Sequence, residues 1–395
     1  MRPQPRAVTS YDVIVLGLGA TGSAAACRLA QRGHRVLGLD RHTPPHDLGS
    51  SHGDTRVTRC AIGEGLHYTP LALRSHAIWR ELEAETGADL FTACGLLVLS
   101  SHGPTAFTHV PAFFANTLAA ATRYGIAHER LDAAELRRRY PAFAIGDDAI
   151  AYFEPGGGFL RPEACVRTQL DVAARHGAAL RYGEAVTRLA ATPGGVTVTT
   201  AQGSYSAQAL VVAAGPWLPE LVDADIARHF RVHRQALYWF DVDAPIADFA
   251  PGRFPVFIWE LPQKTQSIYG FPAIDGTNGG MKIATESFAA ATTAATVARE
   301  VTAAERAAMH RDYVAPYFPA VTPRCLRATA CLYTVTPDFG FVIDRHPRLP
   351  HVILASPCSG HGFKHSAALG EALADMVAGR ASPFDLSAFA LSRFD

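Results

Sequence analysis

The first forty residues alternate between short apolar runs and a stretch of small residues, in an order that predicts strand, turn, helix and strand. An apolar run over 13–16 leads into a glycine-rich turn over 17–22, an alanine-rich segment continues to Gly33, and a second apolar run ends at Asp40. Continuous apolar runs of this length are typical of strands buried on both faces of a parallel sheet. The pattern therefore predicts a βαβ unit at the start of the chain.

Further along, the pattern predicts elements that alternate between two regions. We expect helices over 73–86, 133–140, 162–175, 288–309 and 364–378, and strands over 95–100, 179–182, 195–200, 209–215 and 352–355. Alternating polar and apolar positions between 230 and 283 predict a second, largely antiparallel sheet. The fold class is therefore α/β with an α+β second domain. Its two domains are discontinuous in sequence: 1–90, 150–225 and 328–395 form the first, and 91–149 and 226–327 the second.

Composition narrows the class of partner. The chain has 395 residues, of which 48% are hydrophobic and 18% charged, which excludes intrinsic disorder. Lys plus Arg and Asp plus Glu are equal at 36 each, so no overall field attracts nucleic acid or an anionic membrane. We expect a small-molecule partner and no metal site. Seven cysteines without a C-x-x-C pair, and no apolar run long enough for a signal peptide or a membrane span, favour free thiols and a cytoplasmic protein.

The glycine turn carries the first candidate chemistry. Gly17, Gly19 and Gly22, with Ala20 and Thr21 between them, form G-x-G-x-x-G directly after a strand and at the start of a helix. Backbone N–H groups and the helix dipole can hold a pyrophosphate there. Asp40 follows about 20 residues later, where a carboxylate can accept the ribose hydroxyls. The pattern alone leaves NAD and FAD open, and it leaves a turn without ligand as the bland alternative. Arg41 leaves NADP as a further alternative, although the Asp40 carboxylate would repel a 2′-phosphate.

Four further segments, together with this turn, resemble a known family. They are Gly49-Ser-Ser-His-Gly-Asp-Thr-Arg56, Gly280-Met-Lys282, Ala330-Cys-Leu-Tyr333 and Ser359-Gly-His-Gly-Phe-Lys364. In this order they resemble the flavin amine oxidases of the monomeric sarcosine oxidase and N-methyltryptophan oxidase family, with similarity from about Tyr11 to Phe394. The resemblance implies that the first domain is a Rossmann-type FAD-binding domain and the second a substrate domain. It also implies a monomer.

The same resemblance assigns residues to the cofactor. Cys331 matches the cysteine that the family joins to the flavin, and Arg56 matches an arginine beside the flavin ring. By composition alone, Cys331 would be a buried structural residue. The remaining cofactor positions that the resemblance implies are Ser50, His52, Gly53 and Thr55 in the flavin-lining loop, Val186 near the adenine, Ala214, Gly215 and Trp217 beneath the cofactor, and Gly360, Gly362, Phe363 and Lys364 in a turn near the flavin.

Catalytic roles are implied in the same way. Lys282 matches a lysine that activates dioxygen, and Arg59 with Lys364 matches a cationic pair that binds the substrate carboxylate. Tyr269 and Tyr333 match aromatic positions that line the substrate cavity, with core packing as the alternative interpretation.

At one position the chain departs from the small-substrate members of this family. Where they have a histidine four residues after Lys282, this chain has Glu286. A carboxylate there would repel a carboxylate substrate or attract a second amino group on a larger one. The alternative is a register shift that leaves Glu286 outside the pocket. Ser51 also replaces a histidine, and Trp259 is a candidate to fill pocket volume, so we do not expect sarcosine to be the best substrate.

The expected function is FAD-dependent oxidation of a secondary or N-methylated amino acid to an imine, with dioxygen reduced to hydrogen peroxide. A flavin amine dehydrogenase with another acceptor, an oxidase of a larger or cationic amine, and a flavoprotein without turnover remain alternatives. An NAD-dependent dehydrogenase would share the glycine turn but has no use for Cys331.

Overall fold

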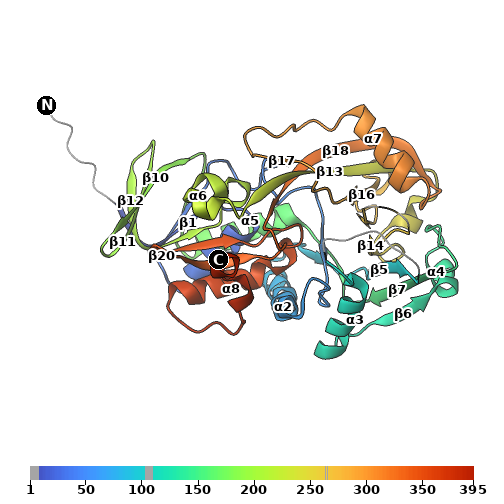
Figure 1. Cartoon of the computed structure of the whole chain (residues 1–395), viewed down its shortest axis with the longest axis horizontal. Helices are drawn as coiled ribbons and strands as arrows, with labels where there is room; N and C mark the ends of the chain where they lie inside the picture. The colour runs from blue at the N-terminus through green and yellow to red at the C-terminus, as the bar shows by residue number, and fades with distance from the viewer. Residues whose placement is uncertain (1–8, 103–109, 263, 265) are drawn as a thin grey trace.

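Two β-sheets, each with its own hydrophobic core, lie at the two ends of the molecule (Figure 1). This computed structural model describes residues 9–102, 110–262, 264 and 266–395. Residues 1–8, 103–109, 263 and 265, which the expected domains include, lie outside the described residues. Within the described ranges, the structure has no helix long and apolar enough to cross a membrane.

The first sheet is built around the predicted βαβ unit. Its path in the described chain is β10-β11-β12-β1-β2-β9, with β20 beside β12 and β19 beside β20. The pairs β1–β12, β1–β2, β2–β9 and β12–β20 are parallel, which confirms the Rossmann-type arrangement. The strand bounds are β1 Thr9–Leu16, β2 Val36–Leu39, β9 Ala179–Arg181, β10 Val186–Thr192, β11 Gly195–Thr200, β12 Ser204–Val212, β19 Val342–His346 and β20 Leu349–Ser356.

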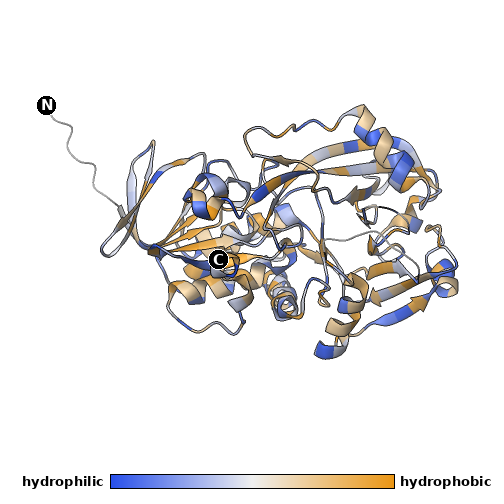
Figure 2. Ribbon diagram, in the orientation of Figure 1, coloured by the Kyte–Doolittle hydropathy of each residue, from blue (hydrophilic) through white to orange (hydrophobic). Residues whose placement is uncertain are grey.

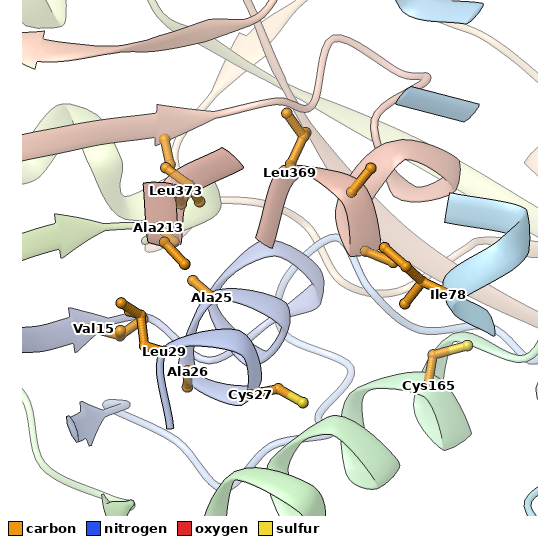
Figure 3. Close-up of a cluster of buried hydrophobic side chains, with 14 of the residues drawn as sticks. Val15, Ala25, Ala26, Cys27, Leu29, Ile78, Cys165, Ala213, Leu369 and Leu373 are labelled. Atoms are coloured by element: carbon orange, nitrogen blue, oxygen red, sulfur yellow. The ribbon is translucent and has the colours of Figure 1, made fainter. Parts of the chain in front are cut away.

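Helices cover this sheet and bury the alanine-rich segment. The four helices are α1 Ala20–Gln31, α2 Thr69–Thr86, α5 Pro162–Arg175 and α8 Ser366–Val377. Figure 3 shows Leu29 of α1 beside Val15 of β1, and Ala25 of α1 on the side toward the α8 residues Leu369 and Leu373, all in one buried cluster. Small residues allow close approach, because a Cβ on Gly370 would lie 2.6 Å from the backbone of Ala24. The central strands of this sheet are largely hydrophobic in Figure 2.

The second sheet follows the path β17-β13-β16-β15-β14-β5-β7-β6, with β18 beside β13. All its pairs are antiparallel except β5–β14, as the alternating pattern predicts. A small sheet of β3, β8 and β4 completes the described strands. The bounds are β3 Arg56–Thr58, β4 Phe91–Thr92, β5 Leu96–Ser101, β6 Glu129–Asp132, β7 Ala149–Glu154, β8 Gly158–Leu160, β13 Arg231–Val242, β14 Val256–Trp259, β15 Ile268–Phe271, β16 Met281–Thr285, β17 Ala291–Thr292 and β18 Val321–Val335. The other α-helices in the described ranges are α3 Phe113–Tyr124, α4 Ala133–Arg139, α6 Ala224–Ala227 and α7 Ala303–Met309.

The expected helix over 288–309 is wrong for most of its length. Ala291–Thr292 form β17, which pairs with β13, and the helix α7 begins only at Ala303. Thr302 caps α7 by accepting a hydrogen bond from the Glu305 N–H, while the Glu305 side chain bonds back to Thr302. Threonines before this cap lose side-chain freedom in a helix, and one of them, Thr292, pairs with Val232 of β13 instead.

Two expected domain boundaries cut through strands of the second sheet. The boundary at 150 falls within β7, and the one at 328 falls within β18, which pairs with β13 from Val321 to Val335. The strand β7 continues because it pairs with β5 on one side and β6 on the other. The strand β18 continues because its long ladder with β13 carries the chain from one end of the molecule toward the other (Figure 1). The two-domain division itself stays a prediction.

Candidate active site

A cavity of about 340 Å³ runs from the glycine turn after β1 to the second sheet. Most of the predicted site residues lie on its wall, although they come from segments far apart in the sequence. Those residues are Gly17, Gly19, Ala20, Thr21, Asp40, Arg41, Ser50, Arg56, Arg59, Val186, Ala214, Gly215, Trp217, Tyr269, Glu286, Tyr333, Gly360, Gly362, Phe363 and Lys364.

The glycine turn has no room for a side chain at its first and third glycines. Gly17 has a φ of +87°, and a Cβ there would lie 2.6 Å from the Ala213 carbonyl oxygen. A Cβ on Gly22 would lie 1.7 Å from the carbonyl oxygen of Gly17. Gly19, by contrast, has only the Ser51 hydroxyl at 3.5 Å and lies on the cavity wall at the start of α1. Gly17 and Gly22 thus shape the turn, and Gly19 allows a ligand to approach the helix N-terminus.

Asp40 is held rigidly at the end of β2. Its carboxylate accepts hydrogen bonds from the backbone N–H groups of Leu18 and His42, each at 2.8 Å. Nearby, the Arg41 guanidinium lies 5.5 Å from the Trp217 ring and pairs with Glu220 at 3.4 Å. A carboxylate fixed by two N–H donors keeps lone pairs for hydroxyl groups in the cavity, which suits a ribose.

Two cations hold the loop before β3: Arg56, at the start of β3, and Lys282, on β16 of the second sheet. Arg56 donates to the carbonyl oxygens of Ser50 at 2.8 Å and Thr55 at 2.9 Å. The Lys282 ammonium donates to the carbonyls of Gly53 at 2.6 Å and Thr55 at 2.9 Å, and to the Thr55 hydroxyl. Burial, and then the charge of Arg56, lower the pKa of Lys282.

Several predicted residues therefore lie behind the wall rather than on it. They are Gly22, His52, Gly53, Thr55, Lys282 and Cys331. His52 is buried, and burial together with the charges of Arg56 and Lys282 lowers its pKa to about 3. The Cys331 sulfur lies 3.5 Å from the Arg56 guanidinium and 3.8 Å from the Ser50 carbonyl oxygen. It is thus directly beneath two residues of the wall, whereas Cys358 is on the wall itself.

A buried ion cluster forms at the other end of the cavity. Arg59 pairs with one Glu64 carboxylate oxygen at 2.7 Å, and Lys364 pairs with the other at 3.4 Å. The three side chains are 1%, 6% and 5% exposed, respectively. Lys364 also donates to the His361 carbonyl at 2.8 Å. Burial lowers the pKa of Lys364 to about 8, although the negative charges of Glu64 and Glu286 oppose this shift.

Arg59 and Lys364, the predicted cationic pair, are therefore brought together. The residue that joins them, Glu64, was not among the predicted site residues. Two cations and one carboxylate leave the cluster with one net positive charge at neutral pH, which suits a single added carboxylate. Glu64 follows Arg59 by only a few residues, so its carboxylate was visible in the sequence. Its contact with Lys364, which lies 300 residues away, was not.

Tyr269, Tyr333 and Glu286 form another part of the cavity wall. The two tyrosine hydroxyls are 3.4 Å apart. A Cβ on Gly360 would lie 3.0 Å from both a Glu286 carboxylate oxygen and the Tyr333 ring. Burial raises the pKa of Tyr269 to about 12, and the charge of Glu286 adds to that rise. Glu286 is thus in the pocket, and the alternative of a register shift is wrong.

The prediction that Trp259 fills pocket volume is wrong. Trp259 packs against Phe143, Tyr317 and Phe318 in the core of the second sheet, and its neighbour Ile258 faces the cavity instead. Successive residues of a strand point to opposite faces, so only one of the two could line the pocket. Other wall residues that sequence reasoning missed are His46, Phe113, Ser267, Phe271 and His361.

The cavity fits a flavin dinucleotide. Its glycine turn has no space for a side chain at Gly17 or Gly22, and it opens onto the N-terminus of a 12-residue helix. The Ser356 hydroxyl on its wall is buried and has no hydrogen-bond partner within the described ranges, as expected of a group that faces a polar ligand. Across those same residues, no group of three or more His, Cys, Asp or Glu side chains is placed to hold a metal ion.

Comparisons with known proteins agree with this geometry. Residues 12–376 match the family described as FAD dependent oxidoreductase. The chain is 40% identical to a monomeric sarcosine oxidase of Streptomyces avermitilis, over 93% of this chain and 94% of that protein. It is 37% identical to an N-methyl-L-tryptophan oxidase of Yersinia pestis, over 97% and 99%. Among solved structures, NikD, an amino acid oxidase of nikkomycin biosynthesis, superposes with a TM-score of 0.80 at 25% identity, over 97% and 98% of the two chains.

Proposed function

Since this chain belongs to the FAD dependent oxidoreductase family, we propose that it is an oxidase of secondary or N-methylated amino acids. In this reaction a hydrogen leaves the carbon next to the amine, a carbon–nitrogen double bond forms, and the two electrons and two protons end on dioxygen as hydrogen peroxide. The observation that carries the proposal is the Arg59–Glu64–Lys364 cluster, which lies on the same cavity as the dinucleotide turn.

FAD would supply the two-electron acceptor. The glycine turn and the N-terminus of α1 would hold its pyrophosphate, and Asp40 its ribose. The Arg56 guanidinium would offer positive charge beside the flavin ring. Gly360, whose backbone borders the cavity without a side chain, would allow close approach from the other side.

The flavin is covalently attached through Cys331 in this proposal. Cys331 lies immediately beneath Ser50 and Arg56, but Cys358 is also close, on the cavity wall. Acid precipitation distinguishes them: the wild-type pellet should stay yellow, Cys331→Ser should release its flavin, and Cys358→Ser should retain it. A yellow Cys331→Ser pellet, or a colourless wild-type pellet, would contradict the attachment.

The substrate is held by its carboxylate. Arg59 and Lys364 are both positioned by Glu64, so a substrate carboxylate would meet two cations whose geometry is already fixed. Charge-assisted hydrogen bonds to both would orient the amine toward the tyrosine side of the cavity. Phe113, whose ring lies 4.8 Å from the Arg59 guanidinium, helps to exclude water from this end.

Lys282 would promote electron transfer to dioxygen by placing charge behind the flavin-lining loop. The competing possibility is a dehydrogenase that uses another acceptor. Lys282→Met should slow reoxidation by air at least tenfold while leaving anaerobic reduction by substrate measurable. Unchanged reoxidation would favour the dehydrogenase.

The function is tested with the purified holoenzyme. Sarcosine, N-methyltryptophan, proline and pipecolate are mixed anaerobically with it, and loss of the flavin absorbance is followed before air is admitted and peroxide is measured. We expect rapid bleaching by at least one N-substituted amino acid, followed by one peroxide per imine. A flavin that dithionite reduces but that no amine in a wide panel bleaches would contradict the proposal.

A further inference from the structure

Glu286 places a negative charge on the cavity wall at a position separate from the carboxylate-binding cluster. It follows directly after β16, and its carboxylate oxygen lies beside Gly360 and the Tyr333 ring. Glu64, the other carboxylate at this end, is shared between Arg59 and Lys364, and the charge of Glu286 also opposes the lowering of the Lys364 pKa. A bound substrate would therefore meet the cations of Arg59 and Lys364 and the carboxylate of Glu286 on the wall of one cavity.

The backbone that carries Glu286 is fixed by a buried glutamine. The Gln235 side chain, on β13, donates to the Ser287 carbonyl at 2.6 Å and accepts from the Ser287 N–H at 2.8 Å. Gln235 is buried, and it lies opposite Cys331 in the β13–β18 ladder. A paired amide contact of this kind holds the residue next to Glu286 in one orientation, so the carboxylate is positioned before any ligand arrives.

The reacting amine is not a suitable permanent partner for this carboxylate. Oxidation of the carbon–nitrogen bond draws on the nitrogen lone pair, so the reacting nitrogen is neutral when the electrons leave. A substrate group that stays cationic beside Glu286 throughout turnover would then be a group other than the reacting amine. An ammonium or guanidinium group would be favoured there, a neutral group tolerated, and a second carboxylate repelled.

From this arrangement we propose that Glu286 selects N-substituted amino acids that carry a second cationic group, with Gln235 as its positioning residue. The inference rests on the proposed function for the identity of the reaction, but the charge preference is a property of the cavity and can be measured without turnover.

Binding is measured first, by calorimetry on the holoenzyme with ligands in which sulfur replaces the amine. The pair is (2-aminoethylthio)acetate and (propylthio)acetate, which have nearly the same shape and differ in one positive charge. Because neither has a reacting amine, any preference for the first comes from its distal ammonium. We expect the cationic ligand to bind about 10- to 100-fold more tightly, the range for a charge-assisted hydrogen bond.

Three variants sharpen the measurement. Glu286→Gln, which keeps the shape, should bring the ratio of the two dissociation constants to within about threefold. Gln235→Leu should also lower this ratio, although a merely structural role would weaken both ligands equally. Glu220→Gln is the matched control, because Glu220 lies on the same cavity beside Arg41 at the dinucleotide end and should leave the ratio unchanged. Flavin content and melting temperature are recorded for each variant.

Turnover then shows which part of the substrate carries the cation. N-(2-aminoethyl)glycine is compared with N-propylglycine, and N-methyl-2,4-diaminobutyrate with N-methylnorvaline, by kcat/KM for peroxide formation. At least one cationic member should exceed its neutral isostere about tenfold or more, and Glu286→Gln should remove the difference.

The two proposals fail differently. If the neutral isosteres are oxidised as well as the cationic ones and the thioether pair binds equally, the role of Glu286 is wrong and the oxidase stands. If no amine reduces the flavin but the thioether pair shows the charge preference, the oxidase is wrong and the cation-binding role stands. A charge preference that survives Glu286→Gln also overturns the assignment.

Discussion

The two ends of the cavity are built in different ways. At the dinucleotide end, one continuous segment supplies the strand, the glycine turn and the helix N-terminus, and the groups that would face a ligand are largely backbone. At the other end, side chains from four distant segments meet: Arg59 and Glu64, Tyr269, Glu286, and Lys364. The backbone geometry of such a turn depends on residues that are close in the sequence, whereas a cluster of charges depends on how distant elements pack.

The largest expected effect is at the dinucleotide end, where the turn has no space for a Cβ at Gly22. In Gly22→Ala, the new Cβ would lie 1.7 Å from the Gly17 carbonyl oxygen, a backbone atom that cannot turn aside as a side chain could. We expect a loss of about 3 kcal/mol or more in stability, with loss of bound flavin. Gly156→Ala is the control, because nothing lies within 4 Å of its Cβ, and it should change stability by about 0.5 kcal/mol or less. Thermal melts measure the stability of the two variants, and flavin absorbance measures their cofactor content. Equal stability and equal flavin content in Gly22→Ala and Gly156→Ala would contradict the steric constraint at Gly22.

Removing one positive charge at the other end of the cavity should leave the fold intact but weaken substrate binding. In Lys364→Met, the Arg59–Glu64 pair remains as a neutral unit, so the net positive charge that would attract a carboxylate is gone. We expect kcat/KM for an amino acid substrate to fall about 30- to 4000-fold, from a cost of about 2–5 kcal/mol for a buried charged hydrogen bond. Steady-state kinetics at constant flavin content measure this. An unchanged KM would show that the carboxylate binds elsewhere.

The same lysine predicts a pH dependence. The Lys364 pKa of about 8 in the free protein means that the cation is present below pH 8 and lost above it, since a carboxylate binds only the protonated form. The groups around it are Arg59, Glu64, Glu286, His361 and His365. We expect kcat/KM to be level below pH 8 and to fall about tenfold per pH unit above it.

Lys364→Arg is the control for this pH dependence, because a guanidinium stays protonated throughout the range. Its profile should lose the decline above pH 8 even if its absolute rate is lower. A decline that persists in Lys364→Arg would assign the titration to another group, such as the substrate amine.

This contrast also explains how much the sequence could predict. The parallel strands, the glycine turn and the position of Asp40 follow from a local pattern, and the structure has them where they were expected. The second sheet was recognisable from its alternation, but its limits were not, because β7 and β18 extend along partners that only the fold brings near. Family resemblance named Arg59 and Lys364. It did not reveal Glu64 as their common partner, since that contact joins residues separated by 300 positions.

The smallest expected effect concerns two neighbours in β14. Trp259 packs among Phe143, Tyr317 and Phe318, so Trp259→Phe should lower stability by about 1–3 kcal/mol and leave KM within twofold of the wild type. Ile258 points the other way, onto the cavity wall, so Ile258→Ala should alter the relative kcat/KM of small and large N-substituted amino acids. Melting curves and a substrate series on both variants separate the faces of the strand. If Trp259→Phe changed substrate preference more than Ile258→Ala, the assignment of these two faces would be reversed, and the cavity would have to extend into what is now the core of the second sheet.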